Sequence, residues 1–198
     1  MSRPLIVGIG GTTRPGSSTD RALRHALAAV RAAGCDTRLF DGEFLMALPH
    51  YDPDAADRSA AEQDFVETVR RAGGIVIATP AYHGGVSGLV KNAIDLLQET
   101  AGDARPYLDG LPVGLVVTAY GWQATGTTLA SLRSIIHALR GWPTPMGVAI
   151  NTGASRVFSE QGECIDDAVA AQLSLVATQV ASFAQKAAVS DAALAAAQ

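Results

Sequence analysis

Short apolar runs alternate along the chain with longer segments in which apolar residues recur at helical spacing. A run of about four to eight apolar residues predicts a buried strand, and apolar positions three and four apart predict a helix buried on one face. The runs predict strands at residues 5–9, 37–41, 75–79, 112–119 and 144–150. The longer segments predict helices at residues 19–34, 59–74, 87–100, 127–141 and 165–187.

The predicted elements alternate strictly between strand and helix, which favours a parallel sheet with helical connections. The runs at residues 75–79 and 112–119 are apolar at nearly every position, as strands covered on both faces are. Right-handed crossovers leave few topologies. We therefore predict an α/β fold, a flavodoxin-like three-layer sandwich with helices on both faces of a five-stranded parallel sheet in the order 2-1-3-4-5.

Length and composition indicate a single domain, because the chain has 198 residues of which 48% are hydrophobic. We place this domain at residues 1–187 and expect residues 188–198 to be a frayed or disordered tail. The net charge is −4, and no basic stripe is present, so nucleic acid is not expected as a partner. The first apolar run is too short to span a membrane and no cleavage site follows it, so we expect a cytoplasmic protein without a membrane partner. Cys35 and Cys164 match no C-x-x-C pattern and are expected to be buried.

A loop rich in hydroxyl groups follows the first predicted strand, with the sequence GGTTRPGSST at residues 10–19. Thr13 replaces a glycine of the dinucleotide-binding loop, and Ser17 replaces the lysine of the NTP-binding loop. The remaining possibility is a site for one terminal phosphate at a helix N-terminus, with charged donors from Arg14. The hydroxyl donors would be Thr12, Thr13, Ser17, Ser18 and Thr19. The alternative is a polar turn in which Ser18 or Thr19 caps the following helix.

A second loop, TPAYHGG at residues 79–85, follows the third predicted strand. Tyr82 offers an aromatic face or edge to a flat ligand, while Gly84 and Gly85 allow the backbone to approach it closely. The alternative is an ordinary turn with Tyr82 packed on the next helix. The chain has no G-x-S-x-G or H-E-x-x-H pattern, and we predict neither a catalytic side chain nor a metal site.

These two loops resemble those of the NADPH-dependent FMN reductase family of flavodoxin-like proteins. Loops in that family are similar to G-S-x-R-x-x-S-x-N and T-P-x-Y-N-G-x-x-x-G-x-x-K-N-x-x-D. Here the first loop reads G-T-T-R-P-G-S-S-T from Gly11, and the second reads T-P-A-Y-H-G from Thr79. The rest of the second pattern is present as Gly88, Lys91, Asn92 and Asp95. The similarity extends over about residues 5–150 and includes the segment LPHYDPD at residues 48–54.

The resemblance implies FMN and either NADPH or NADH as cofactors, with the flavin carrying the chemistry. It implies that the FMN phosphate is held by Thr12, Arg14, Ser17 and Thr19. It implies that the flavin ring is lined by Pro80, Ala81, Tyr82, His83, Gly84 and Gly85. His83 and Gly85 replace a usual asparagine and a frequent serine, which favours weaker retention of the ring and leaves FMN as either a prosthetic group or a substrate that departs.

The loop after the fourth predicted strand, TAYGWQATGTT, is expected to form a third wall. Thr118 can form a hydrogen bond there, Gly121 permits close approach, and the resemblance implies a glycine-containing loop beside the flavin. Tyr120 and Trp122 would cover a ring or gate the entry of the nicotinamide, and the alternative is that Trp122 packs at a subunit interface. The helix expected at residues 87–100 is apolar over more than one face, which together with the resemblance indicates a homodimer or homotetramer. Its outer stripe would be Leu89, Ala93, Leu96 and Leu97.

Three functions follow as hypotheses. The first is an NAD(P)H-dependent FMN reductase that transfers a hydride from the nicotinamide to FMN and supplies reduced flavin to a partner monooxygenase. The second is an enzyme that keeps FMN bound and reduces a quinone, an azo dye or a metal oxyanion. The third is a flavodoxin-type electron carrier, against which Arg14 counts, because flavodoxins have a first loop closer to T-G-x-T-G-x-T.

Overall fold

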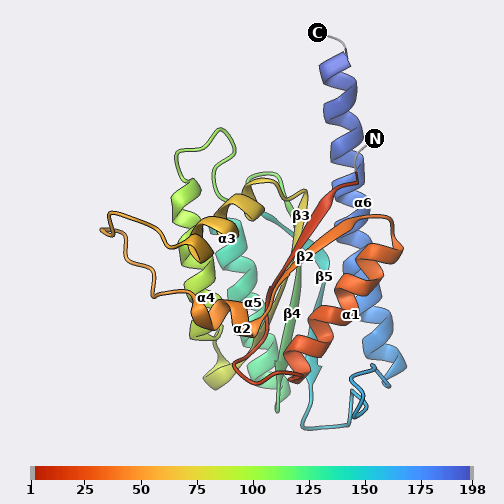
Figure 1. Cartoon of the computed structure of the whole chain (residues 1–198). Helices are drawn as coiled ribbons and strands as arrows, with labels where there is room; N and C mark the ends of the chain where they lie inside the picture. The colour runs from red at the N-terminus through yellow and green to blue at the C-terminus, as the bar shows by residue number, and fades with distance from the viewer. Residues whose placement is uncertain (1–2, 197–198) are drawn as a thin grey trace.

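A computed structural model of the chain describes residues 3–196, and side chains as far as residue 190. One parallel sheet lies at its centre with the strand order β2-β1-β3-β4-β5 (Figure 1). The predicted fold class and strand order are therefore confirmed. The strands are β1 (Leu5–Gly10), β2 (Asp36–Phe40), β3 (Gly74–Pro80), β4 (Pro112–Ala119) and β5 (Trp142–Asn151).

Helices cover both faces of the sheet. Their bounds are α1 (Ser18–Ala32), α2 (Gly42–Ala47), α3 (Ala60–Arg70), α4 (Gly88–Asp95), α5 (Trp122–Ala138) and α6 (Asp167–Ala196), with 3₁₀ helices η1 (Tyr82–Gly84) and η2 (Leu96–Thr100). Helices α1 and α6 pack on one face, and α3, α4 and α5 pack on the other (Figure 1). No helix within residues 3–196 is long and apolar enough to cross a membrane.

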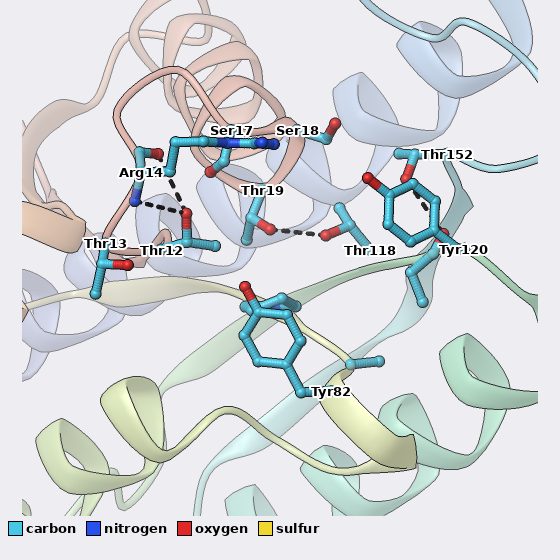
Figure 2. A pocket seen from close by; sticks show the side chains of 13 residues that line it. Thr12, Thr13, Arg14, Ser17, Ser18, Thr19, Tyr82, Thr118, Tyr120 and Thr152 are labelled. Carbon is cyan, nitrogen blue, oxygen red and sulfur yellow. Dashed lines mark hydrogen bonds between the residues drawn. The ribbon is translucent and has the colours of Figure 1, made fainter.

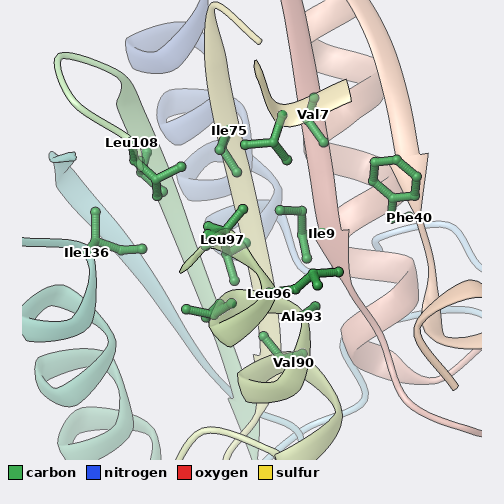
Figure 3. Packing of buried hydrophobic residues seen from close by; sticks show 14 of the residues in the cluster. Val7, Ile9, Phe40, Ile75, Val90, Ala93, Leu96, Leu97, Leu108 and Ile136 are labelled. Atoms are coloured by element: carbon green, nitrogen blue, oxygen red, sulfur yellow. The ribbon is translucent and has the colours of Figure 1, made fainter. Parts of the chain in front are cut away.

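The central strands are buried on both faces because their side chains alternate between two apolar clusters. In β3, Ile75 and Ile77 join the cluster under α4 and α5, whereas Val76 and Ala78 join the cluster under α1 and α6. Figure 3 shows the first of these clusters, where residues of β1 and β3 meet side chains of α4 and η2. This packing explains why the sequence of β3 is apolar at consecutive positions rather than at alternate ones.

Two helix boundaries differ from the prediction. Helix α2 was not expected, and its start depends on one side chain, since Asp41 Oδ1 accepts a hydrogen bond from the backbone N–H of Phe44 at 3.2 Å. Helix α5 begins at Trp122, five residues before the predicted start at Thr127, and its N-cap Gly121 has no side chain to signal the boundary. At the start of α3, Ser59 and Glu62 form a capping box, in which each side chain hydrogen-bonds the backbone N–H of the other residue.

The apolar stripe expected to cover a second subunit is instead part of the core of this chain. Ala93, Leu96 and Leu97 are each at most 2% exposed, and only Leu89 is half-buried. The helix ends at Asp95 and continues as η2, so the leucines that follow turn inward against the sheet (Figure 3). The expectation that this stripe forms the subunit interface is therefore corrected.

Two smaller expectations concern the cysteines and the end of the chain. Cys35 is buried and Cys164 is half-buried, and burial raises the pKa of both thiols. Residues 188–196, for which we expected a frayed or disordered tail, continue helix α6, whose last turns extend beyond the sheet (Figure 1). Residues 197–198 of that tail lie outside the described part of the chain.

Candidate functional site

A pocket of about 330 Å³ opens at the carboxyl ends of β1, β3 and β4 (Figure 2). In a sheet of this order, successive strands are added on one side of β1 up to β2 and on its other side from β3 onward, and ligands of open α/β sheets bind at the carboxyl ends of the strands where this reversal of strand order occurs. The pocket is lined by Thr12, Thr13, Arg14, Ser17, Ser18, Thr19, Pro80, Ala81, Tyr82, Thr118, Ala119, Tyr120 and Thr152. The three loops singled out in the sequence therefore meet around one cavity.

The path of the first loop depends on two glycines, Gly10 and Gly16, for different reasons. Gly10 has φ of +147°, and a Cβ atom there would lie 2.0 Å from the carbonyl oxygen of Ala78 in β3. Four residues later the chain reverses in a turn closed by the Ser17 N–H donating to the Arg14 carbonyl at 3.3 Å. Pro15 and Gly16, the latter at φ of +67°, occupy the positions that a type II turn requires. This turn starts α1 and leaves Arg14 at the rim of the pocket.

The first turn of α1 presents unpaired donors to the pocket. Ser17 is the N-cap, and its hydroxyl accepts from the Asp20 N–H at 3.3 Å, so the cap is neither Ser18 nor Thr19. The backbone N–H groups of Ser18 and Thr19 have no acceptor among the described residues. Unpaired N–H groups and the positive end of the helix dipole together favour an anion at this position.

Two buried threonines join the first and third walls below the pocket. The hydroxyls of Thr19 and Thr118 lie 2.7 Å apart, and the residues are 2% and 4% exposed (Figure 2). Two hydroxyl groups carry two protons, and their mutual hydrogen bond uses one of them. The second proton has no acceptor within the described part of the chain. The pair therefore offers one hydroxyl donor to whatever occupies the pocket.

Arg14 and Thr12 have different roles in the loop. The Thr12 hydroxyl accepts from the Arg14 backbone N–H at 3.1 Å and lies 3.2 Å from the Arg14 carbonyl, to which it donates. This local exchange shapes the loop and occupies the hydroxyl of Thr12. The guanidinium of Arg14 is exposed and forms no ion pair with the residues that the structure describes. It is consequently free to bind an anionic ligand.

The second loop supplies a mostly apolar wall. The Ala81 N–H donates to the Thr118 carbonyl at 2.9 Å, which holds Pro80, Ala81 and Tyr82 against the end of β4. His83 and Gly84 then adopt positive φ values of 54° and 79° and turn the chain toward α5. The structure thus places His83, Gly84 and Gly85 outside the pocket lining, where they shape the loop instead.

The third wall differs in its residues from the predicted one. Gly121 and Trp122 do not line the pocket, because the chain enters α5 at once, and Trp122 is 64% exposed. Tyr120, which was expected in this wall, does line the pocket, together with Ala119 and Thr152, which were not expected there. The N–H of Thr152 donates to the Ala119 carbonyl at 2.8 Å. Thr152 could have been found from the sequence, because it follows the fifth strand, which was predicted to lie next to the fourth. The carboxyl ends of these two strands share one edge of the sheet.

A trio of charged side chains lies beside the first loop. The Nε atom of Arg24 donates to both carboxylate oxygens of Asp20, at 2.9 and 3.0 Å, and a terminal nitrogen donates to Asp41 at 2.9 Å. The hydrogen bond with Asp20 is the largest cause of a raised pKa at Arg24, which keeps its charge. No group of His, Cys, Asp and Glu side chains in residues 3–190 is arranged to hold a metal ion.

The sheet order and the hydroxyl-rich first loop facing an apolar wall define a flavodoxin-like protein with its pocket at the switch point of the sheet. The profile of the family described as NADPH-dependent FMN reductase matches residues 4–155. The chain belongs to that family, and the resemblance inferred from the two loops is confirmed.

Individual relatives agree with this assignment. An NAD(P)H-dependent FMN reductase of Pseudomonas aeruginosa is 29% identical over 164 residues, which cover 82% of this chain and 85% of that protein. An FMN-dependent NADPH-azoreductase of Staphylococcus haemolyticus is 36% identical over 87 residues, 44% of this chain and 43% of that protein. The solved structure of FerB, a flavoenzyme NAD(P)H:(acceptor) oxidoreductase from Paracoccus denitrificans, shares the fold with a TM-score of 0.76 at 18% identity, over 92% of this chain and 98% of FerB.

Proposed function

We propose that this protein is an NAD(P)H-dependent FMN reductase, which transfers a hydride from NADPH or NADH to FMN. One observation carries the proposal: a single pocket combines a free guanidinium and unpaired helix amides at one end with an apolar wall and an aromatic side chain at the other. FMN has the same two-part chemistry, with an anionic phosphate and a flat ring. When bound, it supplies the hydride acceptor that no protein side chain provides.

The residues present fit the phosphate end of FMN. Arg14 contributes a planar fork of charged donors, and the amides of Ser18 and Thr19 contribute uncharged ones. The Ser17 hydroxyl caps the helix as an acceptor and keeps its proton for a phosphate oxygen. Thr13 lies at the rim and the hydroxyl pair of Thr19 and Thr118 lies beneath, so the donors surround the anion on several sides.

The residues at the other end fit a ring whose one face stays accessible. Pro80 and Ala81 give a flat wall, and Tyr82 stands at its edge with 62% of its surface exposed. Tyr120 on the third wall is 83% exposed, so the mouth is open between these two tyrosines. We infer that the chain holds one ring face, leaves the other to the nicotinamide, and contributes orientation rather than proton transfer.

Steady-state kinetics on protein stripped of flavin test the proposal. NADPH and NADH oxidation are measured separately, with and without added FMN. We expect oxidation that depends on FMN and saturates with it, and the two rates give the nicotinamide preference. Folded protein that binds FMN but oxidises neither nicotinamide contradicts the proposal and favours a flavodoxin-type electron carrier.

A second candidate keeps FMN bound and passes electrons to a quinone, an azo dye or a metal oxyanion. The azoreductase relative supports it. Its expected behaviour differs in two ways, because FMN then stays with the protein through gel filtration and the rate saturates with the second acceptor. Release of FMN during gel filtration, with turnover limited by free FMN, supports the first candidate and the supply of reduced FMN to a partner monooxygenase.

For assembly and location we propose a cytoplasmic homodimer or homotetramer. The support is three largely exposed aromatic side chains, those of Tyr82 and Tyr120 at the pocket and that of Trp122 at the start of α5. Aromatic residues of this kind are enriched at protein interfaces. Sedimentation velocity at micromolar concentration tests the assembly, and a monomer with full reductase activity contradicts it.

A further inference from the structure

The carboxylate of Asp20 lies close to the helix N-terminus at which we propose that the phosphate binds, where a second negative charge is unfavourable. Asp20 belongs to the first turn of α1, and its backbone N–H donates a hydrogen bond to the hydroxyl of the N-cap Ser17. The neighbouring residues Ser18 and Thr19 line the pocket. A carboxylate in the first turn stabilises the helix by itself, yet it competes with a second anion at the same helix end. One helical turn rises about 5.4 Å, so an unpaired Asp20 would repel a bound phosphate at short range.

Arg24 removes this conflict in the structure. It lies one turn further along α1 and binds Asp20 through both carboxylate oxygens, with the Asp20 side chain 12% exposed. The pair faces a hollow of about 410 Å³ on the other side of the first loop, which Arg24 shares with Asp41 and Glu43. Arg24 does not line the pocket proposed for FMN. Asp20 does not line that pocket either, so the effect of the pair on a ligand there would be electrostatic.

We propose that Arg24 is a positioning residue for phosphate binding, which neutralises Asp20 and holds its carboxylate away from the anion at the N-terminus of α1. This inference rests on the proposed function, because it needs a phosphate in the pocket. Arg24 also binds Asp41, the N-cap of α2, so that two carboxylates share one guanidinium. Without Arg24, the carboxylates of Asp20 and Asp41 lose the guanidinium that pairs with them, beside the acidic Glu43 and close to the first loop.

A double-mutant cycle on the full chain tests the inference. FMN dissociation constants are measured at low salt for the unmodified protein, Arg24→Gln, Asp20→Asn and the double variant. We expect Arg24→Gln to weaken FMN binding by a factor of about ten, which corresponds to about 1.4 kcal/mol. In the Asp20→Asn background the same substitution should change affinity by no more than about twofold, because the carboxylate that it exposes is gone.

Two controls separate this electrostatic role from a structural one. Riboflavin lacks the phosphate, so its affinity should be the same in Arg24→Gln as in the unmodified protein, and the loss for FMN should shrink at high salt. Arg31→Gln removes an equal charge from the far end of the same helix and should leave FMN affinity unchanged, because the Arg31 side chain hydrogen-bonds Thr37 alone among the described residues. Thermal unfolding of each variant reports whether it is folded.

The outcomes are distinct. Equal losses of FMN affinity from Arg24→Gln in both backgrounds overturn the inference, because Arg24 would then act by its own charge. Equal losses of affinity for FMN and for riboflavin in Arg24→Gln also overturn the inference, because they indicate a structural role. An unchanged FMN affinity in Arg24→Gln overturns it as well, because Arg24 then has no role in binding. An unmodified protein that does not bind FMN refutes the proposed function instead, so the two failures are recognised separately.

Discussion

The buried hydroxyl pair of Thr19 and Thr118 allows stability and ligand binding to be separated. Thr19→Val removes one hydroxyl and leaves the other in a site that is 4% exposed. An unsatisfied buried hydroxyl costs about 1–3 kcal/mol, whereas replacing both partners by apolar groups of the same shape is nearly neutral. Each single valine variant should therefore lose about 2 kcal/mol of unfolding free energy, and the double variant much less than the sum.

Urea unfolding of the flavin-free protein measures the four free energies of this cycle. For a chain of this size, 2 kcal/mol corresponds to a fall in Tm of roughly 4–8 °C. FMN titration gives the second readout. If the free proton of the pair is donated to the ligand, the double variant binds FMN at least about tenfold more weakly, since a hydrogen bond to a charged group contributes about 1.5–3 kcal/mol. Each single variant keeps one hydroxyl with an unused proton at the pocket and should lose less affinity than the double variant.

The double variant is the decisive case, because we expect it to regain stability and not affinity. Additive losses of stability would show that the hydroxyls do not depend on each other, against the 2.7 Å contact between them. Wild-type FMN affinity in the double variant would refute the argument that the pair presents a donor to the pocket.

The remaining predictions concern three other positions. Arg14→Ala should weaken FMN binding by about 2–3 kcal/mol in a titration and leave the unfolding free energy unchanged, because the guanidinium has no partner in the described chain. Gly84→Ala should lower the unfolding free energy by about 1–2 kcal/mol, since φ there is +79°, whereas Gly85→Ala, at φ of −130°, should cost little and serve as its control. Leu96→Ala should lower it by about 2–5 kcal/mol without changing the sedimentation coefficient of the folded protein, because Leu96 is a core residue.

The fold and the anion end of the pocket were predictable because they depend on local signals. Strict alternation of strands and helices fixes the layers, and the carboxyl ends of parallel strands share one edge. The first loop combines turn residues, hydroxyl groups and one arginine within ten positions. The structure uses Arg14-Pro15-Gly16-Ser17 as a turn and Ser17 as the helix cap, both of which follow from the intrinsic conformations of these residues.

The ring end was predicted less well because its shape depends on tertiary contacts. Gly84 and Gly85 were expected to let the backbone approach a ligand closely. The positive φ values at His83 and Gly84 instead turn this segment away from the pocket, toward α5. Gly121 has the composition of a flexible wall, yet it ends the loop as the N-cap of α5. A glycine in the sequence indicates conformational freedom, and only the neighbouring elements decide whether that freedom serves a ligand or a turn.

The apolar stripe that we expected at a subunit interface was mispredicted because the helix changes type within the segment at residues 87–100. A continuous α-helix over residues 87–100 would place Leu97, seven residues after Val90, on the face of Val90, but would turn Leu96 away from it by about 120°. The chain instead changes to η2 at Leu96, where three residues complete a turn, and both leucines point into the core with Val90 (Figure 3). The apolar surplus of this segment is thus used within one chain, and any second subunit must contact other residues. Tyr82 and Tyr120 are exposed and line the pocket, so if they also contact a second subunit, substitutions there should affect assembly and nicotinamide access together.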